Sequence, residues 1–264
     1  MYTDSHCHLT FPELATKIDQ IQLAMAQAQV TRALCICTTL EEFPQVHQLA
    51  LCHDNLWASV GVHPDNEGVL EPTFNDLLNY GALSRVVAIG ETGLDYYRVG
   101  ERTWHDMEWQ RARFRTHIRA ARELKKPLVI HTRSASEDTL AVLREEGEIG
   151  DSGSAGGVFH CFTESAEVAR AALDMGFYIS FSGILTFKSA QNLRDVAAWI
   201  PADRLLIETD SPYLAPVPYR GKTNNPSYVP HVAKTLGDLR NCSPEQIGSL
   251  TSDNFSCLFP AVKI

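Results

Sequence analysis

The chain has 264 residues, 44% of them hydrophobic, and carries 23 Lys and Arg against 32 Asp and Glu, a formal charge of −9. This apolar fraction excludes intrinsic disorder, and the length excludes a small disulfide scaffold because it allows a large core. The negative charge argues against non-specific binding of nucleic acid, which needs many Lys and Arg contacts to phosphate.

No apolar run approaches the roughly 20 residues of a membrane-spanning helix. The polar start of the chain, residues 1–8, lacks the basic and apolar regions of a signal peptide. The seven cysteines form no CxxC pair. We therefore expect a cytoplasmic protein with reduced cysteines, no membrane contact and no obligate protein partner.

Short apolar runs alternate with longer helical segments along the whole chain. Eight runs are predicted strands: residues 1–6, 32–39, 56–62, 86–91, 127–131, 157–160, 177–182 and 205–208. The clearest helical pattern spans residues 104–125, and the arginines on its polar face, Arg113, Arg119 and Arg122, are predicted to be solvated. A final helix is predicted over residues 243–258, because Ser243-Pro244 is typical of a helix start.

Strand and helix units repeat along the chain without a break in composition. The length is near the roughly 250 residues typical of a (β/α)8 TIM barrel. We therefore predict an α/β protein that forms a single (β/α)8 TIM barrel over residues 1–264. A doubly wound sheet is the alternative, but no G-x-G-x-x-G follows a strand. The segment Gly150-Asp151-Ser152-Gly153 resembles a protease nucleophile motif. It precedes a strand, however, and is therefore predicted to lie opposite the chemistry.

Ionisable side chains gather where the predicted strands end. His6 and His8 are separated by one residue at the end of the first strand, so both imidazoles leave the same side and can meet one metal. The other candidates follow the fourth, fifth, sixth and eighth strands: Glu91, His131, His160 and Asp210. Catalytic groups of this fold lie at the carboxyl ends of the strands, so these six side chains are expected to converge.

Four imidazoles and two carboxylates buried together are costly unless cations hold them. This donor set suits zinc or manganese better than an all-oxygen magnesium site. Six ligands also exceed the three protein ligands usual for one catalytic zinc. We therefore expect two divalent ions (zinc, manganese or magnesium), roughly 3.5–4 Å apart, with Glu91 as a candidate bridge.

Six motifs occur in order along the chain: His6-Cys7-His8, Gly61-Val62-His63-Pro64, Gly90-Glu91-Thr92-Gly93-Leu94-Asp95-Tyr96, Pro127-Leu128-Val129-Ile130-His131-Thr132-Arg133, His160-Cys161-Phe162 and Glu208-Thr209-Asp210-Ser211-Pro212-Tyr213-Leu214. This set resembles the TatD family of metal-dependent deoxyribonucleases, and most of all its YcfH-like branch, within the amidohydrolase superfamily. The resemblance implies hydrolysis of DNA phosphodiesters, with 3′ to 5′ exonuclease action on DNA 3′ ends.

The resemblance also implies a ligand assignment. His6, His8 and Asp210 would hold one metal, His131 and His160 the second, and Glu91 would bridge them. Thr10 departs from the family, which usually has Asp or Asn there; that position is not a ligand of the family.

The expected reaction is attack of a metal-activated water on phosphorus, with Asp210 as the proton acceptor and Glu91 as the bridging catalytic group. Four side chains near strand ends, together with Lys222, are expected to bind the substrate phosphate or the leaving group: His63, Arg133, Tyr213 and Arg220. For His63 and Asp95, a hydrogen bond to a metal ligand is an equal alternative, as is loop anchoring for Arg220.

Two other functions stay open. A barrel hydrolase with the same metal centre could attack an amide, ester, lactone or acyl-tRNA bond. The fourth strand lacks a Lys, which disfavours the subgroups that bridge their metals with a carboxylated lysine. A binding scaffold with a structural metal is the second alternative, and the complete ligand set argues against it.

Overall fold

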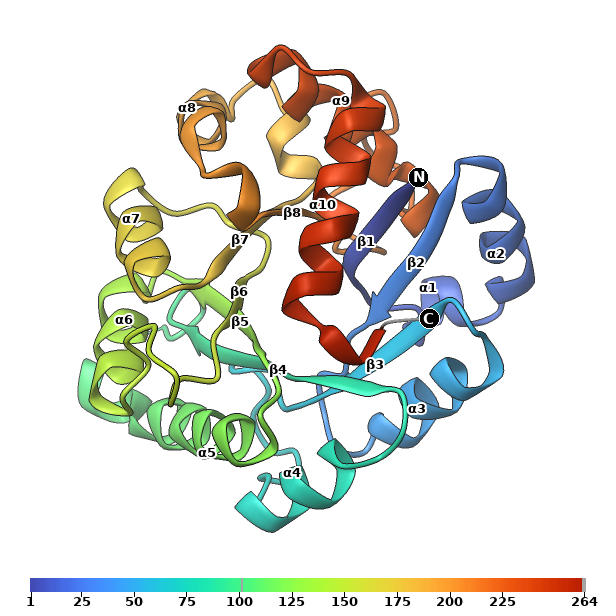
Figure 1. The fold of residues 1–264 in the computed structure, drawn as a ribbon. Helices are drawn as coiled ribbons and strands as arrows, with labels where there is room; N and C mark the ends of the chain where they lie inside the picture. The colour runs from blue at the N-terminus through green and yellow to red at the C-terminus, as the bar shows by residue number, and fades with distance from the viewer. Residues whose placement is uncertain (101, 263–264) are drawn as a thin grey trace.

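The computed structural model describes residues 1–100 and 102–262. In this part of the chain, eight parallel strands form one sheet in the order β1 to β8 (Figure 1). The strands are β1 (Tyr2–Cys7), β2 (Val30–Cys35), β3 (Leu56–Val60), β4 (Val86–Asp95), β5 (Leu128–Arg133), β6 (Gly157–Phe159), β7 (Tyr178–Phe181) and β8 (Leu205–Ile207). A parallel bridge between Cys7 and Ser211 brings the end of the sheet back to its start. The predicted (β/α)8 barrel is confirmed.

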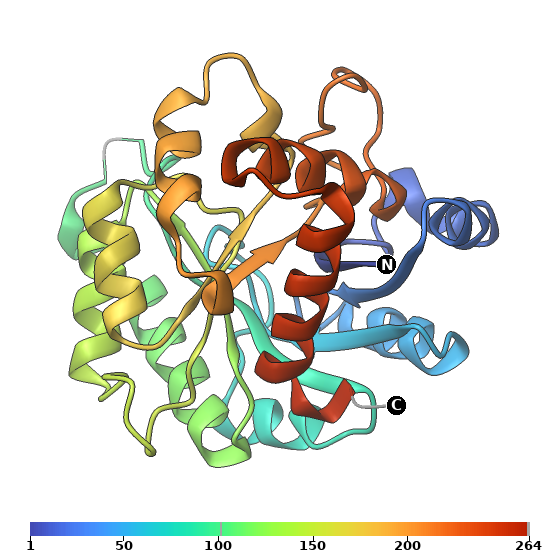
Figure 2. The ribbon, with the colours of Figure 1, turned by 45° about the horizontal axis from the view of Figure 1, so that its top comes forward.

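Helices surround the strands (Figures 1 and 2). The α-helices are α1 (Pro12–Ala15), α2 (Ile18–Gln27), α3 (Phe43–Cys52), α4 (Phe74–Gly81), α5 (Glu108–Leu124), α6 (Ser136–Glu145), α7 (Ala166–Asp174), α8 (Gln191–Trp199), α9 (Val229–Arg240) and α10 (Pro244–Leu258). The short 3-10 helices are η1 (Trp104–Met107), η2 (Gly183–Thr186), η3 (Ala202–Arg204), η4 (Pro226–Tyr228) and η5 (Pro260–Val262). Across the described residues, none of the helices combines the length and apolar character that spanning a membrane requires.

The last helix, α10, closes the amino-terminal end of the barrel. Ser243 caps this helix by accepting a hydrogen bond from the backbone N–H of Gln246, which confirms the predicted start. Phe255 and Phe259 are fully buried and belong to one apolar cluster with the second residues of four strands, and in both views α10 crosses in front of the strands. These strand residues are Val87, Val129, Val158 and Leu206. Only the carboxyl end of the barrel is therefore left for chemistry.

The fourth strand is longer than predicted. It continues past Glu91 to Asp95 because it stays paired with β5, where Gly93 lies opposite His131 and Asp95 opposite Arg133. Gly93 has φ +128°, and a Cβ there would clash with the carbonyl oxygen of His131. Glycine at this position thus lets β4 run close beside β5, which carries Glu91 and Asp95 to His131.

The helix predicted over residues 104–125 divides into η1 and α5. Thr103 and Asp106 form a capping box at η1, and Lys125 ends α5 with φ 52°. The prediction that Arg113 is solvated is wrong. Arg113 is only 4% exposed, because the connection between β3 and α4 folds over it. The side chain of Arg119, by contrast, is 60% exposed.

Candidate metal centre

His6 and His8 meet at the end of β1. Their Nε2 atoms lie 3.1 Å apart, and both residues are buried. The segment after β8 holds them in place: the backbone N–H of Asp210 donates to the carbonyl of His6 (2.9 Å), and that of His8 donates to the carbonyl of Ser211 (2.8 Å). The one-residue spacing therefore places both imidazoles on the same side of the strand, as expected.

The carboxylate of Glu91 lies at the middle of the cluster, and its two oxygens face different histidines. Oε2 is 3.3 Å from Nε2 of His6 and 3.8 Å from Nε2 of His8. Oε1 is 2.8 Å from Nε2 of His160 and 3.2 Å from Nδ1 of His131. This arrangement is the one expected of a group that bridges two cations.

Asp210 completes the Oε2 side of Glu91. Its Oδ1 lies 3.4 Å from Nε2 of His8 and 3.6 Å from Nε2 of His6. The side chain is 15% exposed, whereas that of Glu91 is 3% exposed, so Asp210 is the carboxylate that solvent reaches. The structure thus brings together all six side chains that were predicted to converge.

His63 joins the same cluster. It follows β3, and its Nε2 lies 3.4 Å from Oε1 of Glu91, while its ring meets that of His131 edge to face at 4.4 Å. Burial lowers the pKa of His63 to about 3, so the imidazole is neutral and offers a lone pair. His63 therefore lies among the ligand atoms of the cluster. A residue that contacts only the outer part of a substrate would lie farther from them.

Carboxylates behind the histidines orient the rings. Asp95 Oδ2 lies 3.0 Å from Nε2 of His131, one of the two roles considered for Asp95. Glu208 accepts hydrogen bonds from Nδ1 of His160 (3.2 Å) and from the backbone N–H of Cys161 (2.8 Å). Such contacts fix which ring nitrogen is free for a metal.

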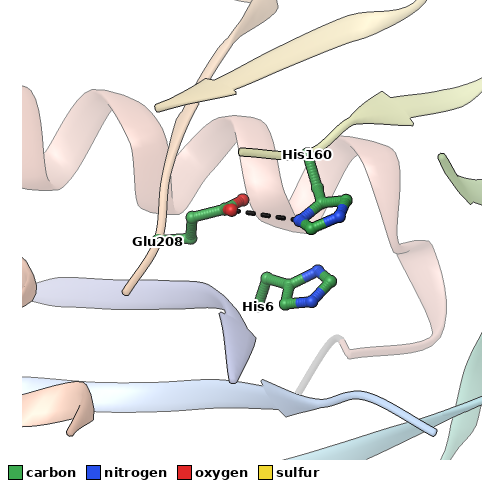
Figure 3. A group of neighbouring side chains, drawn as sticks. All are labelled: His6, His160 and Glu208. Carbon is green, nitrogen blue, oxygen red and sulfur yellow. Dashed lines mark hydrogen bonds and ion pairs between the residues drawn. The ribbon is translucent and has the colours of Figure 1, made fainter. Parts of the chain in front are cut away.

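The sequence reasoning missed Glu208. Figure 3 shows its carboxylate hydrogen-bonded to His160, whose ring faces that of His6. The centroids of the two rings lie 3.8 Å apart, with 8° between the ring planes. One signal was available. Glu208 ends the predicted strand over residues 205–208, two residues after the buried Leu206, so alternation puts these two side chains on the same side.

A further buried carboxylate, Asp4, ties the ends of β1 and β8 together. It accepts hydrogen bonds from the hydroxyl and the backbone N–H of Thr209 and from the backbone N–H of His6. Burial raises the pKa of Asp4 to about 8, although these hydrogen bonds oppose the shift. Asp4 thereby fixes the backbone at His6 and at Thr209, the residue before Asp210.

The charges inside the cluster depend on one another. Burial would raise the pKa of Glu91, but His160, His63 and His6 outweigh it and hold that pKa well below its usual range. Burial likewise opposes protonation of His160, yet Glu91 and Glu208 raise the pKa of His160 well above its usual value. The centre therefore holds protons that a bound cation would displace.

The donor atoms fit divalent cations. Glu91 Oε2 and His160 Nε2 are buried, and neither makes an aligned hydrogen bond with the described residues. Two triads of ligand atoms, each within 4.8 Å, share the Glu91 carboxylate: His6, His8 and Glu91, and His63, Glu91 and His131. Mixed imidazole and carboxylate sets of this kind suit zinc or manganese.

The predicted substrate-binding residues other than His63 lie on the rim. Arg133 is exposed and covers the ring of Tyr97 at 3.6 Å, and Tyr213 is 51% exposed. Arg220 is exposed, rests 3.4 Å from the ring centroid of Phe187 and is thus partly anchored. Lys222 lies over the ring of Tyr219 at 5.5 Å.

Thr10, where the chain departs from the family motif, faces away from the cluster of ligand atoms. Its hydroxyl donates to Glu42 Oε1 at 2.5 Å. Glu42 also accepts hydrogen bonds from the hydroxyl and the backbone N–H of Thr38. Thr10 therefore joins the β1 loop to the β2 loop.

Comparisons with known proteins find relatives along nearly the whole chain. The family model described as TatD related DNase matches residues 3–260. The metal-dependent hydrolase YcfH of Escherichia coli K12 is 46% identical over 97% of this chain and 94% of its own length. The 3′-5′ ssDNA/RNA exonuclease TatD of Salmonella typhimurium is 31% identical over 98% of this chain and 99% of its own. The crystal structure of YjjV, a TatD homologue from Escherichia coli K12, matches with a TM-score of 0.88 and 27% identity over 98% of both chains.

Proposed function

The chain belongs to the TatD family and is a metal-dependent hydrolase, and from this premise we propose that it removes nucleotides from the 3′ end of DNA with two divalent ions. The observation that carries the proposal is the position of Glu91, whose two oxygens face different sets of histidines. Bound ions at such a centre activate water and neutralise charge on the phosphoryl oxygens.

His6, His8 and Asp210 are the proposed ligands on the Oε2 side of Glu91, and His131 and His160 those on the Oε1 side. His63 lies 3.4 Å from Oε1 and is a further candidate on that side. Glu91 belongs to both sides. Asp95 and Glu208 hold His131 and His160 in the ring orientation that such ligation needs.

Asp210 is the proposed proton acceptor for the attacking water. It is the more exposed of the two central carboxylates, and neighbouring histidines hold its pKa below the usual value despite burial. An ionised carboxylate next to solvent can take a proton from water as the oxygen attacks phosphorus. Arg133 is exposed and is the proposed partner for a phosphate of the strand.

The test offers metal-reconstituted protein three substrates: a 5′-labelled single DNA strand, a cyclic amide and an acylated tRNA. We expect a ladder of DNA products shortened from the 3′ end, and no turnover of the other two. Glu91→Ala and Asp210→Ala should abolish the ladder, while Glu167→Ala, an exposed carboxylate on α7, should preserve it.

Turnover of the amide or the acyl bond, with intact DNA, would instead identify the other hydrolase reaction. DNA turnover that is equal in wild type and in both site variants would reveal a contaminating nuclease and remove the support for the proposal.

A further inference from the structure

Helix α5 carries polar side chains on a face that it buries against the barrel. Gln110, Arg113 and His117 follow one another at intervals of three and four residues, so they lie on one side of the helix. All three residues are buried. Buried polar groups are costly unless hydrogen bonds satisfy them, so their partners indicate what this face of α5 does.

Gln110 holds the backbone of Asp95 with both ends of its amide. Its Oε1 accepts the backbone N–H of Asp95, and its Nε2 donates to the carbonyl of the same residue, each at 2.9 Å. The pairing of β3 with β4 ends at Val60 and Ile89, whereas β4 continues to Asp95. Gln110 thus supplies, from a helix, hydrogen bonds of the kind that a neighbouring strand gives to backbone groups.

Asp95 in turn fixes a histidine of the metal centre. Its Oδ2 lies 3.0 Å from Nε2 of His131, and Nδ1 of that ring lies 3.2 Å from Glu91 Oε1. Its Oδ1 accepts the backbone N–H of Tyr97 (2.8 Å), so both carboxylate oxygens are held. A continuous chain of contacts therefore runs from Gln110 through Asp95 to His131.

The other two polar residues of this face anchor α5 close to Gln110. His117 Nε2 accepts the backbone N–H of Val62 (3.0 Å), and Arg113 donates to the carbonyl of His63 (2.9 Å). Both contacts are made with the segment that follows β3, within about two helical turns of Gln110. Gln110 is thus held on a fixed element, which a residue that orients a metal ligand requires.

We propose that Gln110 is a positioning residue for one cation only, the ion on the Oε1 side of Glu91. It acts through Asp95, which sets the orientation of His131. This inference rests on the two-ion centre of the proposed function. Without the amide, the Asp95 carboxylate would be less firmly placed, and the imidazole would bind its ion less well. Because no ligand is removed, this ion should be weakened and not lost.

The ion on the Oε2 side should not depend on Gln110. There, Asp210 and Ser211 from the segment after β8 fix the backbone of His6 and His8 by hydrogen bonds. The two sides of the centre are thus supported by different elements. A general loss of stability would weaken both ions, so an effect on one ion separates positioning from a merely structural role.

Titration of the metal-free protein with Co²⁺ tests the inference. The visible absorption of bound cobalt and isothermal calorimetry give a Kd for each ion. Gln110→Met keeps the size of the side chain but lacks both hydrogen-bonding groups. It should raise one Kd roughly 10- to 100-fold and leave the other within about twofold of wild type. Gln110→Ala, which leaves room for water at both backbone groups, is the second variant and should show the same selective change.

Asn254→Leu is the matched control, because Asn254 is another buried amide that binds backbone groups. It lies on α10, and its Nδ2 donates to the carbonyls of Ala202 (2.7 Å) and Leu205 (2.8 Å) at the amino-terminal end of the barrel. Its loss should lower the free energy of unfolding, as the Gln110 variants do. Both Kd values, however, should stay as in wild type.

Variants that remove one ligand identify the affected ion. His131→Ala impairs the Oε1 side, and adding Gln110→Met should change the Kd of the remaining ion by less than about twofold. His8→Ala impairs the Oε2 side, and adding Gln110→Met should then raise the Kd of the remaining ion roughly 10- to 100-fold.

Weakening of both ions by Gln110→Met, of neither ion, or only of the ion that remains in His131→Ala would overturn the inference and leave the proposed function standing. Binding of a single cobalt ion per wild-type chain would overturn both the inference and the two-ion centre of the proposed function.

Discussion

Glu208 contacts His160 from the side opposite Glu91. Its Oε1 lies 3.2 Å from Nδ1 of His160, while Nε2 of the same ring lies 2.8 Å from Glu91 Oε1. Glu208 is fully buried, and its second oxygen makes no hydrogen bond with the described residues. The hydrogen bond to Glu208 makes Nδ1 of His160 the donor and leaves Nε2 of the same ring free to bind a cation. Glu208 is therefore a positioning residue.

Replacing Glu208 should therefore weaken metal binding without removing a ligand. We expect Glu208→Gln to lower metal affinity roughly 10- to 100-fold, because the amide no longer polarises the ring of His160 and can present the wrong group to Nδ1. Isothermal titration with zinc or manganese measures the change. Glu167→Gln on the surface of α7 is the control; equal affinities for the two variants would contradict the role of Glu208.

Metal removal should destabilise the folded protein. The central carboxylates and histidines are buried beside one another, and a cation binds the native arrangement but not the unfolded chain. At a free metal concentration about 100 times the Kd, the gain is about 2.7 kcal/mol, which corresponds to a Tm increase of roughly 5–10 °C for a chain of this size. Thermal unfolding with chelator and with added zinc, manganese or magnesium tests this expectation. An unchanged Tm with all three metals would contradict it.

Arg113 should contribute more to stability than the exposed Arg119 of the same helix. Its guanidinium donates to the carbonyls of His63 (2.9 Å) and Asn66 (2.8 Å) and pairs with Glu71. Arg113→Ala removes a buried guanidinium and leaves the part-buried carbonyls of His63 and Asn66 without this donor, and we expect a loss of about 3 kcal/mol in the free energy of unfolding. The exposed Arg119→Ala should cost less than about 1 kcal/mol. Urea denaturation measures the free energy of unfolding of both variants. Similar unfolding midpoints for Arg113→Ala and Arg119→Ala would contradict the prediction.

His117 should make stability depend on pH. The residue is fully buried; its Nε2 accepts the backbone N–H of Val62 (3.0 Å), and its Nδ1 donates to the carbonyl of Arg113 (2.8 Å). Burial, reinforced by the charge of Arg113, lowers the pKa of His117 to about 4 from the ordinary histidine value of 6.5. Between these two values the unfolded chain binds a proton that the folded protein does not.

The free energy of unfolding should consequently fall as the pH drops from about 6.5 to 4, by roughly 3 kcal/mol from His117 alone. His117→Gln can keep both hydrogen bonds without titrating, so the difference in stability between wild type and this variant should change with pH in that range. Urea denaturation of both proteins at several pH values, with chelator present, measures it. A constant difference would contradict the prediction.

The sequence by itself determined the barrel and the strand ends that carry its chemistry. Alternation along a strand puts His6 and His8 on one side because successive side chains point in opposite directions. Periodicity and capping residues likewise predicted α10 from Ser243 onward. These features are local, so they can be recognised from neighbouring residues alone. Whether the six converging side chains bind metal remains a prediction.

Only the tertiary structure decided which groups meet across the barrel. The extension of β4 to Asp95 depends on its register with β5, and that register brings Asp95 to His131. The positions of His63 beside Glu91 and of Glu208 behind His160 depend likewise on how different strands align. Arg113 is buried by a connection far from it in sequence. Such contacts are set by the relative placement of distant segments, which no local pattern of residues encodes.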